Sequence, residues 1–375
     1  MLTRLVLAAA FLVAASVTSS ALGVVVAGPE RLLFAQARDG CDIHDLPDAP
    51  ARAFRNATGA MVLFAPNYQN RALVGADLAH LKRDCAVRFA ASGRALPSLL
   101  DDRTWLQAFH TDDGRDVFAF ASASFIPYRH DMPCAAGKAR TDCWYNGIAA
   151  LSSTDGGATF GYLGTPPQQI AFPPPAPYDP NVANPAGFMT ATNIITWRGA
   201  LYTILWRRVE DGKSHNCLAR ADADEPLRWQ LWSGKEFVPA ATFTGSAWSI
   251  ATTDCAAVGP TTQPVIRSVV LHEAGQTFIA VFQSRIRGQP GFYYATSRDL
   301  VRWSAPALLL AVDLKADAGP GESYAGYPSI IDDTSADRNF GTVGATASLV
   351  FVRVKPVGQR SVLRDLVALP LRIMN

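Results

Sequence analysis

The chain has 375 residues, of which 49% are hydrophobic and 18% are charged, and its formal net charge is +2. This composition is sufficient for a packed core and carries too little charge for a disordered protein. No basic block or aromatic-basic stripe occurs in the sequence, so we expect no nucleic-acid partner.

The N-terminal residues predict export. Arg4 is the only charged residue before Glu30, an apolar run spans Leu5–Ala15, and small residues follow it. This order of regions is typical of a secretory signal peptide. Cleavage is expected after Ala21 or after Ala37, and the mature protein is then secreted or periplasmic.

The alternative is a retained anchor, because the run from residue 5 to residue 28 is long enough to span a bilayer. A membrane is expected as a partner only through such an uncleaved segment. We therefore divide the chain into a targeting segment, 1–37, and a single domain, 38–375.

Six cysteines follow the leader, and an even number in an exported protein predicts disulfides. Six cysteines allow 15 pairings, so the connectivity is open. The favoured pair flanks a short glycine-containing loop, and the other two pairs would each lie within one repeat: Cys134–Cys143, Cys41–Cys85 and Cys217–Cys255. No CxxC or HxxxH spacing occurs, so we expect no structural zinc site and no cofactor.

Short apolar strands punctuated by Gly, Asp and Pro fill the body of the chain and predict an all-β fold. The expected strands are Gly59–Ala65, Trp105–Phe109, Asp116–Ser122, Ala200–Trp206, Val265–Leu271, Thr277–Gln283 and Ser348–Arg353.

The segment Ser153–Phe160 reads S-x-D-x-G-x-x-aromatic, the pattern of the hairpin turn called an Asp box. Its carboxylate can accept backbone N–H bonds, and its glycines permit positive φ. Ser297–Trp303 and Arg220–Trp229 are weaker copies at similar spacing. Such turns recur in β-propellers, although three ordinary hairpins in a β-sandwich are the alternative.

The spacing predicts a five-bladed β-propeller of about four strands per blade. We expect the strand at Gly59–Ala65 to complete the last blade, which would remove the free sheet edges. The expected units run over residues 40–98, 99–172, 184–240, 260–312 and 322–372.

The loops that enter the innermost strands of a propeller converge on one face, and we place the functional residues there. Carboxylates from different blades could act as an acid/base pair on a glycosidic bond. Asp48 would be the base or nucleophile and Glu322 the acid, with Asp101 or Asp102 orienting the sugar. Asp48 could instead cap the turn before Pro50, and Asp101 could be an exposed loop charge.

Aromatic and polar residues of the same loops are candidates for sugar binding. Trp105 and Tyr327 would stack on a ring, whereas Arg52 and Asn193 would bind hydroxyl groups. Tyr324 would pack beside Glu322, and Arg267 lies in the loop that enters the fourth unit. Trp105 could equally be a core residue, and Arg52 could pair with a carboxylate.

Two strings resemble the five-bladed propeller glycosidases of the arabinanase, xylosidase, invertase and levansucrase types. They are the Ser-x-Asp-Leu-x-x-Trp-Ser-x-Pro string at Ser297–Pro306 and the segment Tyr327–Asp332. The resemblance implies a hydrolase that acts on a carbohydrate with two carboxylates.

A second resemblance is to a group of exported bacterial propellers. It rests on the segments Asp48–Phe54, Trp105 with Asp112–Gly114, Cys143–Asn146, Ser153–Phe160 and Cys217–Arg220. That group has a His-Asn-Glu-Tyr-like string where this chain reads Ser122–Phe125, so a glutamate is missing here. The resemblance then implies an inactive protein or another acid, such as Glu322. A non-catalytic glycan-binding or protein-binding propeller is therefore the second hypothesis. Sialidases are less similar, because the Arg-Ile-Pro motif is absent.

Overall fold

The computed structural model describes residues 22–134, 143–209, 213–261, 263–319, 321–357 and 361–374. In these residues the strands form five sheets, and each of the five expected units contains most of one sheet. The first sheet holds β3 (Arg52–Arg55), β4 (Met61–Phe64), β5 (Ala72–Gly75) and β6 (Lys82–Arg83). The second holds β7 (Arg103–His110), β8 (Val117–Phe125), β9 (Tyr145–Ser153), β10 (Gly161–Tyr162) and β11 (Ile170–Phe172).

The third sheet is the largest. It holds β12 (Gly187–Ala191), β13 (Ile195–Trp197), β14 (Ala200–Arg208), β15 (Ser214–Asp222), β16 (Arg228–Trp232), β17 (Phe237–Phe243), β18 (Trp248–Ile250) and β19 (Ala257–Val258). The fourth holds β20 (Ile266–His272), β21 (Thr277–Ile286), β22 (Gln289–Ser297), β23 (Ala307–Ala311) and β25 (Thr342–Val343). The fifth joins β24 (Tyr324–Ile331), β26 (Thr346–Val357) and β27 (Ser361–Met374) to β1 (Gly23–Val26) and β2 (Arg31–Ala35).

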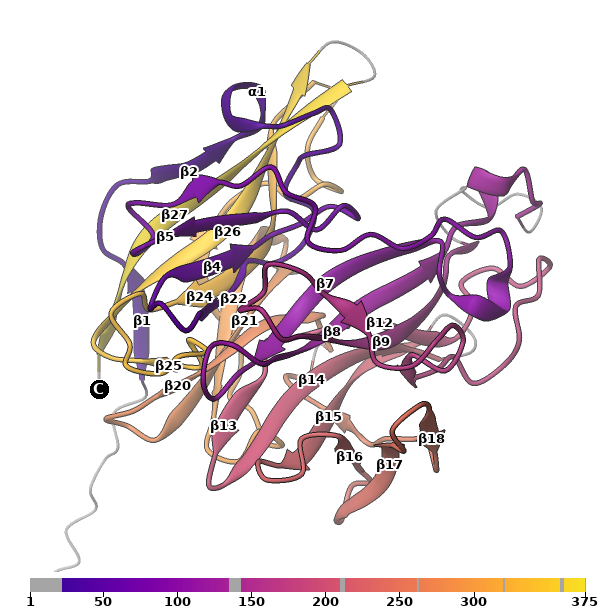
Figure 1. Ribbon diagram of the computed structural model, residues 1–375. Helices are drawn as coiled ribbons and strands as arrows, with labels where there is room; N and C mark the ends of the chain where they lie inside the picture. Colours follow the sequence, from indigo (N-terminus) through magenta and orange to yellow (C-terminus); the bar gives the residue numbers. More distant parts are fainter. Residues whose placement is uncertain are drawn as a thin grey trace, which may run out of the picture.

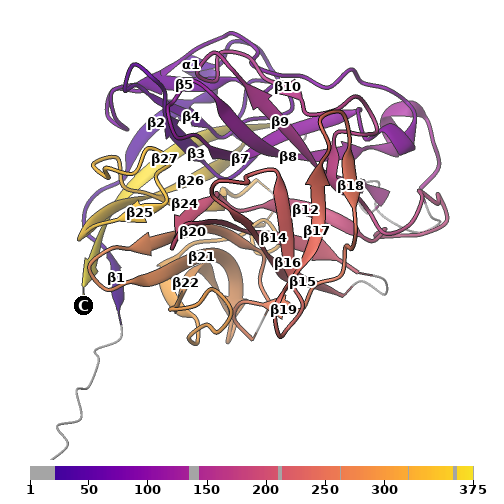
Figure 2. The same ribbon diagram turned by 60° about the horizontal axis from the view of Figure 1, so that its bottom comes forward.

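The sheets follow one another around a common centre, as the sequence of colours in Figure 2 shows. Contacts join β3 to β7, β7 to β12, β13 to β20, β20 to β24, and β24 back to β3. The chain is therefore all-β and has a propeller arrangement, with the first strands of the sheets innermost. Among the described residues the helices are short: α1 (Gln36–Asp39) and two 3₁₀ turns, Pro97–Leu99 and Pro127–His130.

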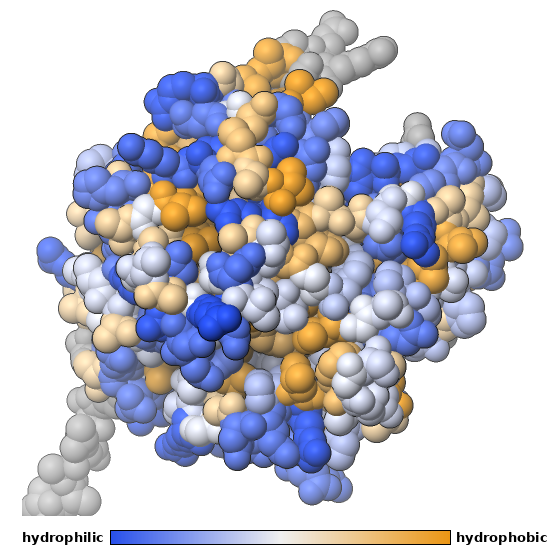
Figure 3. Space-filling view, viewed as in Figure 1, coloured by the Kyte–Doolittle hydropathy of each residue, from blue (hydrophilic) through white to orange (hydrophobic). Residues whose placement is uncertain are grey.

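Each pair of neighbouring sheets shares an apolar core. Phe54 and Phe109 lie 5.3 Å apart between the first and second sheets. Phe120 and Trp229 lie 4.9 Å apart between the second and third. Further cores follow between the third and fourth, the fourth and fifth, and the fifth and first sheets. On the face drawn in Figure 3, hydrophobic residues form separate patches within a hydrophilic surface.

The first and last described strands meet in the fifth sheet (Figure 1), where β1 and β2 both pair antiparallel with β27. The expectation that Gly59–Ala65 completes the last unit is wrong, because β4 pairs with β3 and β5 in the first sheet. The expected targeting segment, 1–37, overlaps β1 and β2, and cleavage after Ala37 would remove both strands. Residues 1–21 lie outside the described residues, so the leader itself stays a prediction.

No helix in the described part of the chain is both long and apolar enough to cross a bilayer.

The three predicted disulfides are confirmed. The structure pairs Cys134 with Cys143, Cys41 with Cys85, and Cys217 with Cys255. The bond between Cys41 and Cys85 joins the segment after α1 to the segment after β6, across a sequence separation of 44.

Opening the Cys41–Cys85 bond with a Cys41→Ser, Cys85→Ser double substitution should reduce the free energy of unfolding by about 2–4 kcal/mol. The removed cross-link restores conformational freedom to the unfolded chain. Urea unfolding of protein purified from an oxidising compartment measures the effect. Equal midpoints for the variant and the wild type, or six free thiols in the wild type by mass spectrometry, would contradict the assignment.

The turn at Ser153–Phe160 is held by its own side chains. Ser153 Oγ accepts the Gly157 N–H at 2.9 Å, and Asp155 Oδ1 accepts the Thr159 N–H at 2.9 Å. Gly156 and Gly157 have φ of 72° and 80°. A side chain at Gly157 would also meet the ring of Phe54, since an added Cβ would lie 2.5 Å from Phe54 Cζ.

The turn at Ser297–Trp303 repeats this pattern without glycine. Ser297 Oγ accepts the Leu300 N–H at 2.9 Å, and Asp299 Oδ1 accepts the Arg302 N–H at 2.7 Å. Leu300 itself takes the positive φ, 63°. Both aspartates therefore stabilise turns locally.

Asp155→Ala should reduce the free energy of unfolding by about 1 kcal/mol, because the Thr159 N–H loses its acceptor. Desolvation opposes ionisation of Asp155, but hydrogen bonds from Thr159 and Ser153 outweigh it and lower its pKa. The stabilisation is thus present above about pH 4 and is lost as the pH falls. The difference in melting temperature between the two proteins should become smaller as the pH falls from 7 to 3. A constant difference would contradict this account.

Candidate functional site

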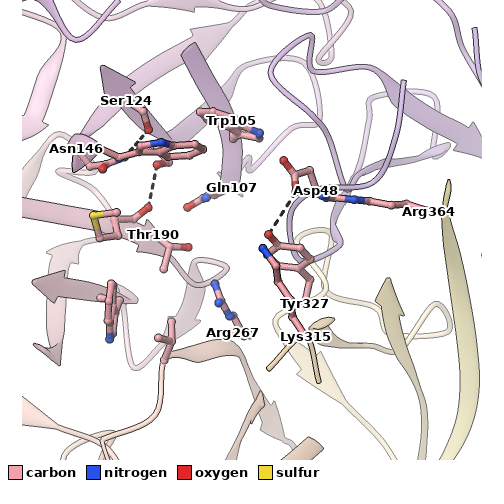
Figure 4. A pocket seen from close by; sticks show the side chains of 15 residues that line it. Asp48, Trp105, Gln107, Ser124, Asn146, Thr190, Arg267, Lys315, Tyr327 and Arg364 are labelled. Carbon is pink, nitrogen blue, oxygen red and sulfur yellow. Dashed lines mark hydrogen bonds and ion pairs between the residues drawn. The ribbon is translucent and has the colours of Figure 1, made fainter. Parts of the chain in front are cut away.

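A pocket of about 410 Å³ lies where the innermost strands of the sheets converge. All five sheets or their entry loops contribute to it. Its walls are Asp48, Trp105, Gln107, Ser122, Ser124, Trp144, Asn146, Met189, Thr190, Trp206, Val265, Arg267, Lys315, Tyr327 and Arg364. We call it the axial pocket. Figure 4 shows Asp48, Tyr327 and Arg364 on one side and Ser124, Asn146 and Thr190 on the other.

Asp48 contributes the only carboxylate among the lining residues, and it is already paired. Its Oδ1 accepts the Tyr327 hydroxyl at 3.3 Å and forms an ion pair with Arg364. The negative charge of Asp48, together with burial, raises the pKa of Tyr327. The Tyr327 hydroxyl therefore stays protonated at neutral pH and donates a hydrogen bond to Asp48. Arg364 comes from β27 and balances the charge of Asp48.

Arg267, on β20, has a different environment. Its guanidinium lies 5.4 Å from the ring centroid of Tyr327, which is a cation–π contact. Its Nε is buried and has no hydrogen-bond partner in the described chain. Burial lowers the pKa of Arg267. The side chain thus presents a partly desolvated positive charge to the pocket.

Three tryptophans supply the aromatic surface. Trp105 on β7 and Trp144, just before β9, are stacked with centroids 6.0 Å apart and an interplanar angle of 23°. Trp206 lies on β14. The indole N–H groups of Trp144 and Trp206 are buried and have no hydrogen-bond acceptor within the described residues. Such groups are rare in native proteins and call for a ligand or water as partner.

The polar wall is ordered by contacts between sheets. Gln107 Oε1 accepts the Ala191 N–H at 2.9 Å, and Ser122 Oγ donates to the Met189 carbonyl at 2.8 Å. Asn146 donates to Ser124 Oγ, while its own Oδ1 is buried without a partner in the described chain. The side chains that line the pocket therefore carry one buried acceptor without a partner, beside the buried indole and guanidinium donors.

Four predicted residues come together in this pocket: Asp48, Trp105, Arg267 and Tyr327. Arg52 does not line it. Its guanidinium donates to the Ala191 carbonyl at 3.5 Å, to Ser329 Oγ at 2.9 Å and to the Arg267 carbonyl. These acceptors lie on β12, β24 and β20, so Arg52 ties the innermost strands together. Burial, and then the charge of Arg267, lowers the pKa of Arg52 to about 9.

Asn193 also has a structural role instead of the expected place in the pocket. Its amide donates to the Val269 carbonyl at 2.7 Å and accepts the Val269 N–H at 3.0 Å. Both bonds join the third sheet to the fourth. They occupy the amide donor and acceptor of Asn193 that would otherwise bind a sugar hydroxyl.

Asp101 and Asp102 lie outside the lining of the axial pocket. Asp101 Oδ1 accepts the Ser92 N–H at 3.1 Å and the Tyr162 hydroxyl at 3.2 Å. Asp102 accepts the Ile126 N–H at 3.0 Å and forms an ion pair with Arg129. These carboxylates hold the segments around the start of β7.

Glu322 is exposed and lies outside the lining as well. The expectation that it has no local backbone to cap is wrong, because its Oε2 accepts the Gly319 N–H at 2.8 Å. Tyr324 lines a separate hollow of about 160 Å³ with Asp313 and Arg353. The structure therefore does not bring Glu322 and Tyr324 into one site with Asp48.

Most of the remaining lining residues were not among the predicted ones. Gln107 follows Trp105 by two positions on one strand, and this alternation is a sequence signal for a place on the same face. Trp144 and Asn146 belong to the segment Cys143–Asn146, which indicated only a resemblance to exported bacterial propellers. No sequence pattern indicated Arg364, because 316 positions separate it from its partner Asp48.

One group of metal-ligand atoms occurs in the described residues, at His215, Cys217 and Cys255. Both sulfur atoms belong to the same disulfide and therefore are not thiolate ligands. The expectation of no cofactor stays a prediction.

No family model matches this chain, and no curated protein matches it. Among solved structures, the catalytic domain of the Coprinopsis cinerea GH62 alpha-L-arabinofuranosidase is similar, with a TM-score of 0.50 and 11% identity, covering 93% of this chain and 96% of that one. The endo-arabinase from Bacteroides thetaiotaomicron has a TM-score of 0.48 and 12% identity, covering 88% and 97%. At these identities the first comparison supports the β-propeller fold alone.

Proposed function

We propose that this chain is a carbohydrate-binding β-propeller that holds its ligand in the axial pocket without hydrolysing it. The observation that carries the proposal is the pairing of stacked tryptophans with buried polar atoms that have no partner in the described chain. Indole faces match the C–H faces of sugar rings, and sugar hydroxyls both donate and accept hydrogen bonds. Trp144, Trp206 and Asn146 offer groups of both kinds.

The same pocket argues against hydrolysis. Glycosidases of the paired-carboxylate type need two carboxyl groups about 5–9.5 Å apart across the scissile bond. Asp48 is the single carboxylate among the residues that line the axial pocket, and its charge is neutralised by Arg364. The similar structure from Coprinopsis cinerea is named an alpha-L-arabinofuranosidase, which agrees with a sugar ligand.

We further infer that each of the five sheets is one blade of a five-bladed propeller. The closed series of contacts between innermost strands supports this assignment. Three disulfides suit an oxidising compartment, so we propose a secreted or periplasmic protein. We place the end of its leader at Ala21, before β1.

A glycan array tests this function. The purified protein should bind a limited set of glycans, and Trp144→Ala should lose the signal because the stacking surface is removed. Trp303→Ala is the matched control, since Trp303 belongs to the turn after β22 and does not line the pocket. Absence of binding to every glycan, or equal loss in both variants, would contradict the proposal.

A further inference from the structure

The axial pocket has an excess of positive charge. Three cationic side chains line it, Arg267, Lys315 and Arg364, against the single carboxylate of Asp48. Asp48 is paired with Arg364. Arg267 and Lys315 have no ion pair with an acidic group among the residues that the structure describes.

Arg267 is the informative member of this set. Lys315 is exposed, so solvent screens its charge, whereas Arg267 is mostly removed from solvent. A desolvated charge without a counter-ion is costly, and buried cations in proteins are normally paired. The guanidinium of Arg267 lies over the face of the Tyr327 ring, and its Nε has no acceptor in the described chain.

Arg52 is a second cation near Arg267, and it adds to the positive potential at the pocket. The guanidinium of Arg52 donates to the backbone carbonyl of Arg267, and the charge of Arg267 adds to burial in lowering the pKa of Arg52. Arg52 uses backbone carbonyls and Ser329 as acceptors and has no carboxylate partner in the described chain. A ligand with a negative charge would therefore meet an uncompensated positive field at Arg267.

We propose that the ligand of the axial pocket is an acidic sugar whose carboxylate accepts hydrogen bonds from the guanidinium of Arg267. This inference rests on the proposed function and adds the chemical class of the ligand. A guanidinium presents parallel N–H donors that match the two oxygens of a carboxylate. The tryptophans would hold the ring of the sugar, and Lys315 would contribute longer-range attraction at the pocket edge.

The test compares matched ligands. Oligosaccharides of galacturonic, glucuronic and mannuronic acid are titrated beside their carboxyl-reduced neutral counterparts, and binding is followed by tryptophan fluorescence. We expect at least one acidic oligosaccharide to bind tenfold or more tightly than its neutral counterpart. Arg267→Gln should abolish this preference, whereas Arg302→Gln should keep it, because Arg302 is exposed and pairs with Asp299 in a turn.

The outcomes separate the two proposals. If neutral oligosaccharides bind as tightly as acidic ones, the inference fails and the proposed function stands. If sulfated oligosaccharides bind and uronates do not, the carboxylate assignment fails. If no sugar of any class binds, the proposed function fails with it. The wild-type comparison requires no variant, and the melting temperature of Arg267→Gln shows whether that variant is folded.

Discussion

Replacing Asn70 by alanine should reduce the free energy of unfolding by about 3 kcal/mol or more. Asn70 is fully buried between the first and second sheets. Its amide donates to the carbonyls of Thr104, at 2.8 Å, and Phe89, at 3.1 Å, and its Oδ1 accepts the Leu106 N–H at 2.7 Å. Alanine leaves these backbone groups buried without partners, at about 1–3 kcal/mol each.

The backbone adds to this effect. Asn70 has a φ of 45°, a left-handed conformation that asparagine tolerates better than alanine. Urea unfolding measures the change, and Asn181→Ala is the control because Asn181 is exposed and bonds only to Asp179. A loss below about 1 kcal/mol would show that water replaces the amide, and the account of this contact would be wrong.

Asn70 is one of several buried asparagines whose amides bond to the backbone of another segment. The same arrangement explains why Asn193 is not a ligand residue. Asn216 accepts the Ile266 N–H and donates to the Pro264 carbonyl, as Asn193 does with Val269. Asn339 forms the same pair of bonds with Thr111. Each buried amide replaces a missing strand neighbour and joins segments from different sheets. These asparagines therefore fix the relative positions of the innermost strands that carry the pocket.

The second large effect is expected at Trp144. Trp144→Ala should weaken glycan binding by roughly 30-fold or more, since buried aromatic anchors contribute about 2 kcal/mol or more to binding. The substitution removes both the ring that stacks on Trp105 and the unpartnered indole N–H. Isothermal titration calorimetry with a glycan found on the array measures the change.

Stability should change less than binding in this variant, because Trp144 is only partly buried and precedes β9 instead of lying within it. Glu322→Gln is the control variant, since Glu322 is exposed and lies outside the pocket lining. This variant should bind the glycan with the affinity of the wild type. Binding unchanged in Trp144→Ala, or lost in Glu322→Gln, would move the site away from the axial pocket.

The sequence predicted the fold through local patterns. Strand periodicity, turn residues and cysteine number depend on near neighbours along the chain, so the strands and disulfides were predictable. The strand that closes the last sheet was not, because β1 lies in a segment whose apolar residues resemble a leader. Pairing of β1 with β27 joins the two ends of the chain, and such a contact leaves no local signal.

The lining of the axial pocket was predicted in part for the same reason. Asp48, Trp105 and Tyr327 line it as expected, because they lie at or near the starts of innermost strands. The expectation that Glu322 has no local backbone to cap was wrong, because its bond to Gly319 depends on the shape of one loop. The ion pair of Arg364 with Asp48, which decides whether that carboxylate is free for catalysis, forms only when the fifth and first sheets meet.

The central claim is that the axial pocket binds a carbohydrate and leaves it intact. One measurement tests both halves. Wild-type protein and Trp144→Ala are titrated with the preferred glycan by calorimetry, and the same samples are analysed by mass spectrometry after prolonged incubation. The account predicts saturable binding by the wild type, loss of that binding in Trp144→Ala, and recovery of the glycan at its original mass. Shorter products in the wild-type sample, or equal binding by both proteins, would contradict it.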